Sequence, residues 1–436
     1  MNEPHHAYSR LQQATELLDG IILQPQYPAD SVMDRYFSTH RKMGSKDRGF
    51  AAETVYACLR HRRELAALAL PVAGEAADTA AWLVGTYLLK YSGWSARALE
   101  QAGFGGDAVA LVERVRALDM FEFPLAVRAN LPDWLSESLV KQFGEAETLK
   151  LAEALNHPAP VDIRVNTLKT DRDALKQTLA AAEYEMDPTP YSPFGLRRDK
   201  RGPLFNTDAF RDGGFELQDE GSQLIGFLLD PKPKQKVVDF CAGAGGKTLQ
   251  LAALMNNSGV LYACDVSEQR LNRIKPRLKR AGVDTIQRRL LHDENDTRLK
   301  AWWGKMDAVL VDAPCSGTGT LRRNPDVKWK SVDIGALHAL QRSILTAASQ
   351  LVRPGGRLVY ATCSLLDQEN HAVVEEFLSQ HPDFSILPAD SIFKTHGIEL
   401  KDAFTAGGAM QLLPHRHGTD GFYAMAMQRH GTGDSE

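Results

Sequence analysis

The spacing of apolar side chains divides the chain into a helical part and a part in which strands alternate with helices. Over the first 145 residues, apolar positions recur every three or four residues, as in Leu11, Ala14, Leu17 and Leu18, and no strand-like alternation occurs. This pattern predicts an all-helical domain over residues 1–145.

The pattern changes after Pro158. Residues 161–169 alternate as a strand does, residues 171–182 follow helical spacing after the capping residues Thr170 or Asp171, and residues 195–205 indicate a strand and a turn. These elements predict a small α+β subdomain over residues 146–213.

Residues 214–430 repeat a third pattern, in which short apolar runs that end in small or polar residues alternate with helical stretches. This alternation predicts an α/β domain with a mostly parallel sheet and right-handed crossovers. The closing run, 422–429, is expected to be an antiparallel edge strand, and 431–436 a disordered tail. The other expected strands are 236–241, 260–266, 285–291, 308–314 and 357–364.

Charge and composition exclude several classes of protein. The formal net charge of −4 argues against nucleic-acid binding through net charge alone, while basic clusters around Gly44 and over 197–201 fit either RNA contact or a solvated surface. The five cysteines form no CxxC pair, so neither a disulfide framework nor a zinc ribbon is expected. The histidines show no ligand spacing, and no signal segment or membrane-length apolar run occurs. We expect a cytoplasmic protein without a metal or membrane span.

Residues 239–248 join a predicted strand to a predicted helix through a loop rich in glycine. Glycine lets the backbone approach a ligand closely and exposes N–H groups at the helix start. The next strand ends in Asp265, which can accept both hydroxyls of a ribose, and Asp293 can bond an adenine amino group. A phosphate-binding loop is disfavoured because Cys241 stands where that motif has its first glycine. The loop fits either NAD or S-adenosylmethionine.

Two predicted strand ends carry thiols and a carboxylate. The segment 307–319 delivers Asp312 and Cys315 into a loop of small residues, and the run 357–364 delivers Cys363. Because open α/β sheets place ligands at the carboxyl ends of their strands, we expect these side chains to face one ligand. Hydride transfer needs no thiol there, so the cysteines favour S-adenosylmethionine over NAD and indicate covalent chemistry.

The motifs together resemble a known family. The segments DFCAGAGGKT, DAPCSGTG, RRNPDVKW, ATCS and HGTDGFYAM, preceded by RVNTLK and LQDEGSQL, resemble the Sun/Nop-type RNA cytosine-5 methyltransferases, most closely the bacterial RsmB-like ribosomal RNA enzymes. The resemblance implies a Rossmann-like class I S-adenosylmethionine-dependent methyltransferase domain with a seven-stranded sheet, preceded by an RNA-recognition subdomain and a NusB-like helical domain. One departure is Ala244, where the family usually has proline, which should alter loop rigidity without removing a ligand.

The resemblance also implies roles for individual residues. Cys363 would be the nucleophile that adds to C6 of cytosine, and Cys315 would assist product release. Asp312 would bond the N3/N4 edge of the base, with Lys247 close to it. By contrast, Cys58 and Cys264 are expected in the core. The cofactor would be bound by Cys241, Ala242, Gly243, Ala244, Gly245, Gly246, Lys247, Asp265, Asp293 and Asp312.

The expected partner is RNA. Arg322, Arg323 and Lys328 follow the Cys315 loop closely, so they are predicted to contact phosphates while Trp329 stacks on a base. The predicted activity is methylation of cytosine C5 in 16S ribosomal RNA by a monomer. A transfer RNA substrate and a non-catalytic assembly factor stay open as alternatives. DNA is disfavoured, because DNA cytosine methyltransferases take their nucleophile from the Pro-Cys and have no matching Thr-Cys.

Overall fold

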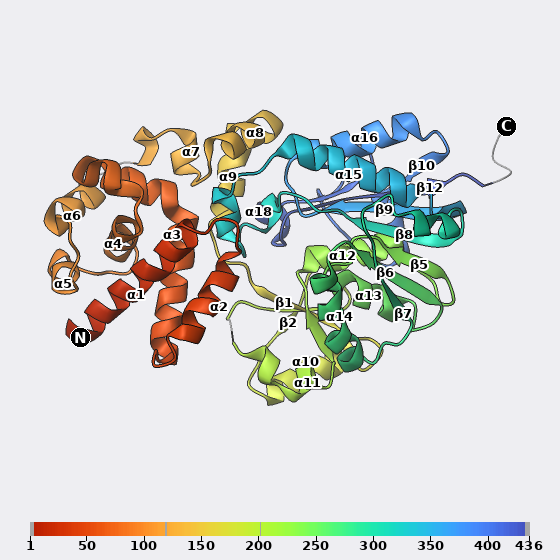
Figure 1. The fold of residues 1–436 in the computed structure, drawn as a ribbon, viewed down its shortest axis with the longest axis horizontal. Coiled ribbons are helices and arrows are strands. Elements are labelled where there is room, and N and C mark those ends of the chain that lie inside the picture. The colour runs from red at the N-terminus through yellow and green to blue at the C-terminus, as the bar shows by residue number, and fades with distance from the viewer. Residues whose placement is uncertain (1–3, 118–119, 201, 432–436) are drawn as a thin grey trace. The chain divides into compact units, whose positions relative to one another are not determined.

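The computed structural model describes residues 4–117, 120–200 and 202–431 (Figure 1). Its contacts divide the chain into two compact units. The helical unit comprises Met1–Pro158 and Thr320–Val332, and the sheet unit comprises Ala159–Gly319 and Asp333–Glu436. The division into three domains at 145 and 213 stays a prediction. Apart from Gly431, the predicted tail lies outside the described residues.

The helical unit contains no strand among its described residues, as the apolar spacing predicted. Leu17 of α1 (Pro4–Ile22) and Leu65 of α3 (Ser45–Ala73) are buried in its core, which the other helices complete. Helix α3 is interrupted at His61, where φ is −106° and ψ is 17°. The other helices are α2 (Ala29–Thr39), α4 (Ala80–Lys90), α5 (Ala96–Gln101), α6 (Ala108–Ala117), α7 (Leu125–Arg128), α8 (Asp133–Phe143) and α9 (Glu145–Leu155), with 3₁₀ turns η1 (Gly74–Asp78), η2 (Met120–Glu122) and η6 (Pro325–Trp329).

The sheet unit begins with a small antiparallel sheet of strand order β2-β3-β1-β4. Ile163 and Leu196 of this sheet are buried against Leu175 of α10 (Arg172–Ala181). The carboxylate of Asp171 accepts the Ala174 N–H, which confirms the predicted start of this helix. The strands are β1 (Val161–Val165), β2 (Asp187–Pro188), β3 (Gly195–Arg198) and β4 (Phe215–Leu217), with η3 (Leu204–Asn206) and α11 (Asp208–Arg211) between β3 and β4.

The main sheet has the strand order β10-β12-β9-β8-β5-β6-β7, and an eighth strand, β11, pairs with β12. Strands β9, β8, β5, β6 and β7 are parallel, so the predicted mostly parallel sheet is confirmed, with β11 in addition to the seven strands expected. The strands are β5 (Lys236–Asp239), β6 (Val260–Asp265), β7 (Ile286–Leu290), β8 (Met306–Asp312), β9 (Val352–Thr362), β10 (Phe384–Leu387), β11 (Met410–Leu412) and β12 (Phe422–Arg429).

The run 422–429 forms an antiparallel strand, as predicted, but the prediction that it lies at the edge of the sheet is wrong. Strand β12 pairs with β9 on one side and with β10 and β11 on the other. Its first six residues are buried, which agrees with their nearly continuous apolar sequence, FYAMAM.

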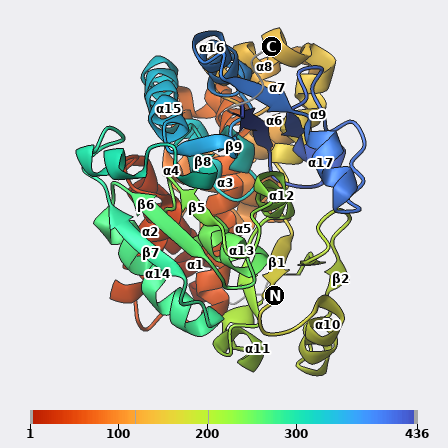
Figure 2. The same cartoon turned by 90° about the vertical axis from the view of Figure 1, so that its right-hand side faces the viewer.

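Alternate side chains of the central strands fill two cores. Val237 and Leu310 pack on α12 and α13, whereas Val238 and Val309 pack on α15 and α16, because successive side chains of a strand point to opposite faces. Figure 2 shows these two pairs of helices on opposite sides of the sheet. The helices of this part are α12 (Glu220–Leu229), α13 (Gly246–Leu254), α14 (Glu268–Ala281), α15 (Ile334–Ser349), α16 (His371–Gln380), α17 (Ala389–Thr395) and α18 (Pro414–His417), with 3₁₀ turns η4 (Thr297–Trp302), η5 (Thr318–Thr320) and η7 (Asp367–Glu369).

The carboxyl ends of the parallel strands lie along one edge of the sheet. The register places Asp312 beside Ala361 and Asp239 beside Leu310, so the last residues of β5, β8 and β9 are neighbours. The loops that follow these strands carry the residues with candidate chemistry. Within the described ranges, no helix has the length and apolarity needed to cross a membrane.

Candidate active site

Two free thiols meet at the carboxyl ends of β8 and β9. The sulfur atoms of Cys315 and Cys363 are 3.4 Å apart. The two loops are joined by backbone hydrogen bonds from the Ala313 N–H to the Ala361 carbonyl at 2.9 Å and from the Gly319 N–H to the Cys363 carbonyl at 2.8 Å. The structure therefore brings together the two cysteines that the sequence placed at neighbouring strand ends.

Gly319 allows these loops to pack closely. A Cβ atom at this position would lie 2.2 Å from the Gly421 carbonyl oxygen and 2.8 Å from that of Cys363. The Gly421 N–H in turn donates to the Gly319 carbonyl at 2.8 Å. Any larger residue would push the Cys315 loop away from the strand end that carries Cys363.

A buried carboxylate, Glu369, holds both cysteine loops. The Ser316 N–H donates to its Oε1 at 2.8 Å, and Gln341 Nε2 donates to the same oxygen at 3.0 Å. The hydroxyls of Ser316 and Ser364 both donate to Oε2. Because each serine directly follows one of the two cysteines, Glu369 positions both thiols at once.

Lys247, in the first turn of α13, forms an ion pair with Asp312, the last residue of β8. The ammonium of Lys247 donates to Asp312 Oδ2 at 2.7 Å, and the lysine side chain is 11% exposed. Burial lowers the pKa of Lys247, but the nearby charges of Asp312, Cys363 and Asp239 outweigh it and raise the pKa above its usual value. The lysine is therefore cationic at neutral pH.

The cysteines differ in their surroundings. The hydrogen bond with Cys363, followed by burial, raises the pKa of the Cys315 thiol well above its usual value, so this thiol is protonated at neutral pH. Burial likewise raises the pKa of Cys58, Cys264 and Cys241. Cys58 and Cys264 are fully buried, which confirms that they belong to the core.

The glycine-rich loop leaves open space beside a fixed carboxylate. Gly243 has a φ of +54°, and a Cβ atom there would meet nothing within 4 Å. Asp265 Oδ2 accepts the Gly243 N–H at 2.8 Å, and its Oδ1 accepts the Ser267 N–H at 2.7 Å. This combination of an open turn and an oriented carboxylate at a strand end fits the ribose of an adenosine-containing cofactor.

Further residues of the predicted cofactor loop are held from neighbouring elements. The Ala242 N–H donates to the Cys264 carbonyl at 2.8 Å, and Arg277 donates to the carbonyl of Ala244. The latter contact restrains the position where the family usually has proline. Asp293 is half exposed after β7, and its hydrogen bond with His292 lowers its pKa.

Comparisons with known proteins agree with this geometry. A model described as 16S rRNA methyltransferase RsmB/F matches residues 226–428, and one for the RsmF/B-like ferredoxin-like domain matches residues 131–204. The probable ribosomal RNA small subunit methyltransferase B of Synechocystis is 31% identical over 92% of this chain and 95% of its own length. The chain belongs to the RsmB/F family of rRNA methyltransferases.

Solved structures confirm the fold expected of an RsmB/F enzyme. The crystal structure of PH0851 superimposes with a TM-score of 0.77 at 26% identity and covers 96% of this chain and 99% of its own. A methyltransferase homologue from Pyrococcus horikoshii has a TM-score of 0.60 at 31% identity, covering 72% of this chain and all of its own. The Rossmann-like methyltransferase domain and the helical N-terminal region are therefore both confirmed.

The RNA contacts predicted for this RsmB/F member after the Cys315 loop need correction. Arg322 is 6% exposed and Lys328 is 1% exposed, and both lie in the Thr320–Val332 segment of the helical unit. The side-chain nitrogen of Lys328 donates to the Arg60 and Asn130 carbonyls, each at 3.1 Å, and to the Asn156 side chain. Burial, followed by the charge of Arg60, lowers the Lys328 pKa to about 7.

The remaining residues of that segment also have structural partners. The Trp329 indole N–H donates to the Leu59 carbonyl at 2.8 Å, so Trp329 anchors the segment within the helical unit. Its predicted stacking on a base stays a prediction. Asp326 accepts the Ala29 N–H at 3.3 Å. Arg323 is half-buried, and its predicted RNA contact stays a prediction.

Two residues of the site were missed in the sequence. Glu369 lies in the polar run DQEN, where nothing in the local pattern distinguishes a buried carboxylate from a solvated one. Asp239 ends β5 and is 1% exposed; Thr248 donates to its Oδ2 at 2.6 Å, while its buried Oδ1 has no partner within the described residues. Burial raises the Asp239 pKa to about 7. Its place at the end of the first parallel strand was the one available signal.

Proposed function

We propose that this protein methylates C5 of a cytosine in 16S ribosomal RNA through a covalent adduct between Cys363 and C6 of the base. The observation that carries the proposal is the pair of free thiols 3.4 Å apart, next to the Lys247–Asp312 ion pair. Membership of the RsmB/F family supports an rRNA substrate.

The chemistry of cytosine explains the need for a thiol. C5 is a weak nucleophile, so the Cys363 thiolate first adds to C6 and the electron pair of the C5–C6 double bond becomes available at C5. The raised pKa of Cys315 argues against Cys315 as the nucleophile, because a protonated thiol is a poor nucleophile.

Asp312 and Lys247 act on the opposite edge of the base. Addition at C6 places negative charge on the N3 side of the ring, and a proton donor hydrogen-bonded there lowers the barrier. Asp312 accepts a hydrogen bond from the N4 amino group. In its protonated form it donates a proton to N3 and so neutralises the negative charge there. Lys247, which donates to Asp312 Oδ2, keeps a cation beside the developing charge.

Release reverses the first step. After C5 has formed its bond to the methyl group, the C5 proton leaves to a base, the electron pair restores the double bond, and the Cys363–C6 bond breaks with the electrons on sulfur. Cys315 assists this step, since its sulfur lies in contact with that of Cys363.

S-adenosylmethionine supplies the electrophilic methyl group. The residues that would hold it are the 241–247 loop, which is open at Gly243, and the carboxylate of Asp265, with Asp293 near the adenine. The buried Oδ1 of Asp239 lies at the same strand edge and has no partner among the described residues, which fits a ligand that donates a hydrogen bond. The cysteines, Asp312, Lys247 and Asp265 all lie in the sheet unit of one chain, so we propose that the enzyme is a monomer. We also propose that it acts in the cytoplasm, where rRNA is made.

The decisive experiment is bisulfite sequencing of total RNA from cells with and without the gene. We expect one cytosine of 16S rRNA to lose its methylation mark, and re-expression of the wild-type protein to restore it. A mark lost from a transfer RNA would replace the substrate assignment. No lost mark, combined with no transfer of a labelled methyl group to 16S rRNA by the purified protein, would contradict the enzymatic function.

A further inference from the structure

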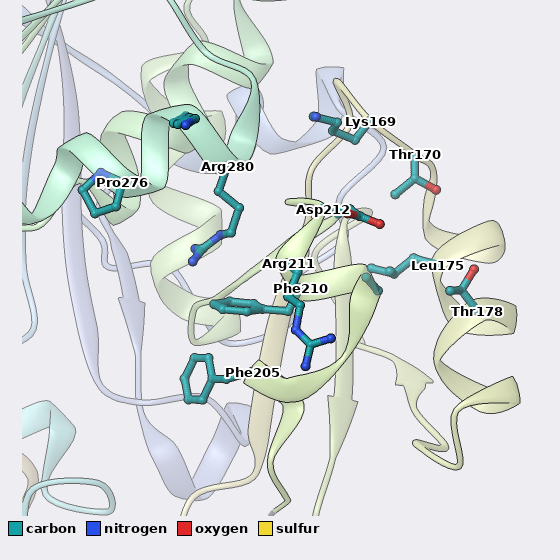
Figure 3. A pocket seen from close by; sticks show the side chains of 13 residues that line it. Lys169, Thr170, Leu175, Thr178, Phe205, Phe210, Arg211, Asp212, Pro276 and Arg280 are labelled. Carbon is teal, nitrogen blue, oxygen red and sulfur yellow. The ribbon is translucent and has the colours of Figure 1, made fainter.

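A large groove in the sheet unit lies away from the thiols. It has a volume of about 970 Å³ and is bordered by the loop after β1, by η3 and α11, and by the last turn of α14 (Figure 3). Helix α14 begins directly after Asp265 and Val266, and its 14 residues span roughly 20 Å at 1.5 Å per residue. Its last turns also approach the cofactor loop, because Arg280 and Arg277 share Glu216 and Arg277 donates to the Ala244 carbonyl. None of the residues that line the groove is a cysteine or a predicted cofactor ligand.

Aromatic side chains form one wall of the groove. Phe205 is 58% exposed, an unusual exposure for phenylalanine, and its ring meets that of Phe210 edge-to-face at 4.9 Å. The Arg280 guanidinium lies 3.9 Å from the centre of the Phe210 ring. Figure 3 shows Arg280 reaching from α14 toward Phe210, with Phe205 beside it. Phe205 thus packs against Phe210, and Phe210 packs against the Arg280 guanidinium, while Phe205 keeps an exposed surface.

Cations border the same groove. Lys169 and Lys279 are exposed, and neither makes an ion pair within the part of the chain that the structure describes. Arg280 shares Glu216 with Arg277, so two guanidiniums are balanced by one carboxylate. Arg211 pairs with Asp208, and Asp212 adds one negative charge to the wall.

Helix α14 extends the positive charge from the groove toward the cofactor edge. It carries six basic residues and one acidic residue, although the whole chain has a net charge of −4. Arg270, Arg273 and Lys275 are exposed and, like Lys279, make no ion pair with any described residue. Unpaired cations beside an exposed aromatic are the arrangement by which proteins bind single-stranded nucleic acid: phosphates contact the cations and a base stacks on the ring.

We propose that this groove binds a single-stranded segment of the RNA substrate, with one base stacked on Phe205 and phosphates held by Lys169 and Lys279. The inference rests on the proposed function, because it places part of the same RNA. A target cytosine must be unpaired or flipped out before it can reach the thiols. RNA held in the groove beside the target favours the unpaired state of the region around that cytosine.

The test measures binding of a short fluorescein-labelled single-stranded RNA to the full-length protein by fluorescence anisotropy over a series of salt concentrations. Phe205→Ala should weaken binding about fivefold or more, the lower range for loss of one base–aromatic stack, and leave the salt dependence unchanged. Lys279→Gln should weaken binding and also reduce the slope of log K against log salt by about 0.7. Phe205→Tyr should bind as the wild type does.

Two matched controls remove similar groups elsewhere. Phe121→Ala removes a phenylalanine that is 79% exposed in the helical unit, and Lys234→Gln removes an exposed lysine from the loop before β5. Both should bind RNA as the wild type does. If the groove variants bind RNA as tightly as these controls do, and the wild type binds and methylates RNA, the groove is not an RNA-binding site. The proposed function would then still hold. A wild-type protein that neither binds nor methylates RNA would overturn both.

Discussion

Replacement of Glu369 tests whether one carboxylate positions both thiols. Its two oxygens accept hydrogen bonds from the Ser316 N–H, the hydroxyls of Ser316 and Ser364, and Gln341 Nε2. Glu369→Ala removes every acceptor of this set. Glu369→Gln keeps the shape and one acceptor oxygen, and the serine hydroxyls can rotate to accept from the new amide group.

The structure gives the size of each effect. In Glu369→Ala the serine hydroxyls can turn to each other, since their oxygens lie 3.2 Å apart, and Gln341 keeps its bond to the Pro314 carbonyl at 2.9 Å. The Ser316 N–H is left unsatisfied, at about 1–3 kcal/mol, and the empty volume adds about 1 kcal/mol. The free energy of unfolding should therefore fall by about 2–4 kcal/mol for Glu369→Ala and by about 1 kcal/mol for Glu369→Gln.

The effect on catalysis should exceed the effect on stability. A displacement of about 1 Å at a reacting group can slow a reaction about 100-fold, and the loss of Glu369 releases both cysteine loops. We expect kcat to fall about 100-fold for Glu369→Ala and less than tenfold for Glu369→Gln, with S-adenosylmethionine affinity within about twofold of wild type.

Urea unfolding and methyl transfer to 16S rRNA measure the two effects on the same protein samples. Glu375→Ala, which removes a carboxylate that is 74% exposed on α16, is the control and should change neither value. Wild-type kcat in a correctly folded Glu369→Ala protein would refute the positioning role. An equal loss in Glu375→Ala would show that the effect is not specific to the Glu369 carboxylate.

Three further predictions concern other residues. Cys363→Ala should abolish methyl transfer while RNA binding persists, and full activity in this variant would remove its assignment as nucleophile. Cys315→Ala should accumulate a protein–RNA adduct that survives denaturant, seen as a slower band on a gel; turnover without such a band would contradict its role in release. Lys328 has a pKa of about 7 in the folded protein and a usual pKa near 10 in the unfolded chain. Between these two pH values the unfolded chain holds a proton that the folded chain has lost, so the free energy of unfolding rises with pH. Urea unfolding should show the wild type gaining up to about 1.4 kcal/mol per pH unit over Lys328→Met from pH 7 upward, and a constant difference would contradict the buried neutral amine.

The meeting of the two cysteines could be predicted because it depends on patterns that are local in sequence. Alternating apolar runs indicate a parallel sheet, and parallel strands bring their carboxyl ends to one edge. Cys315 and Cys363 each follow such a run, so their proximity needed only the neighbouring order of β8 and β9. The helical part was predicted by its 3.6-residue spacing for the same reason.

Burial of charged residues could not be predicted, because it depends on partners far along the chain. Lys328 stands between Val327 and Trp329, close to the charged Asp326 and Lys330, and this mixed local sequence does not mark it as buried. Its acceptors come from residues 172 to 268 positions earlier. Glu369 likewise accepts two hydrogen bonds from Ser316, which lies 53 positions earlier in the sequence. A local charge pattern indicates whether a side chain is polar, but not which distant backbone will surround it.

The inclusion of Thr320–Val332 in the helical unit has a consequence for synthesis of the chain. Lys328 leaves the ribosome 172 residues after Asn156, which at about 5–20 residues per second is roughly 10–30 s later. During that time the helices of Met1–Pro158 must exist with the Arg60 and Asn130 carbonyls open to water. A fragment that ends at Pro158 would lack the Thr320–Val332 segment and its hydrogen bonds. A shortened protein meant to reproduce the helical unit therefore needs this segment added as a separate peptide.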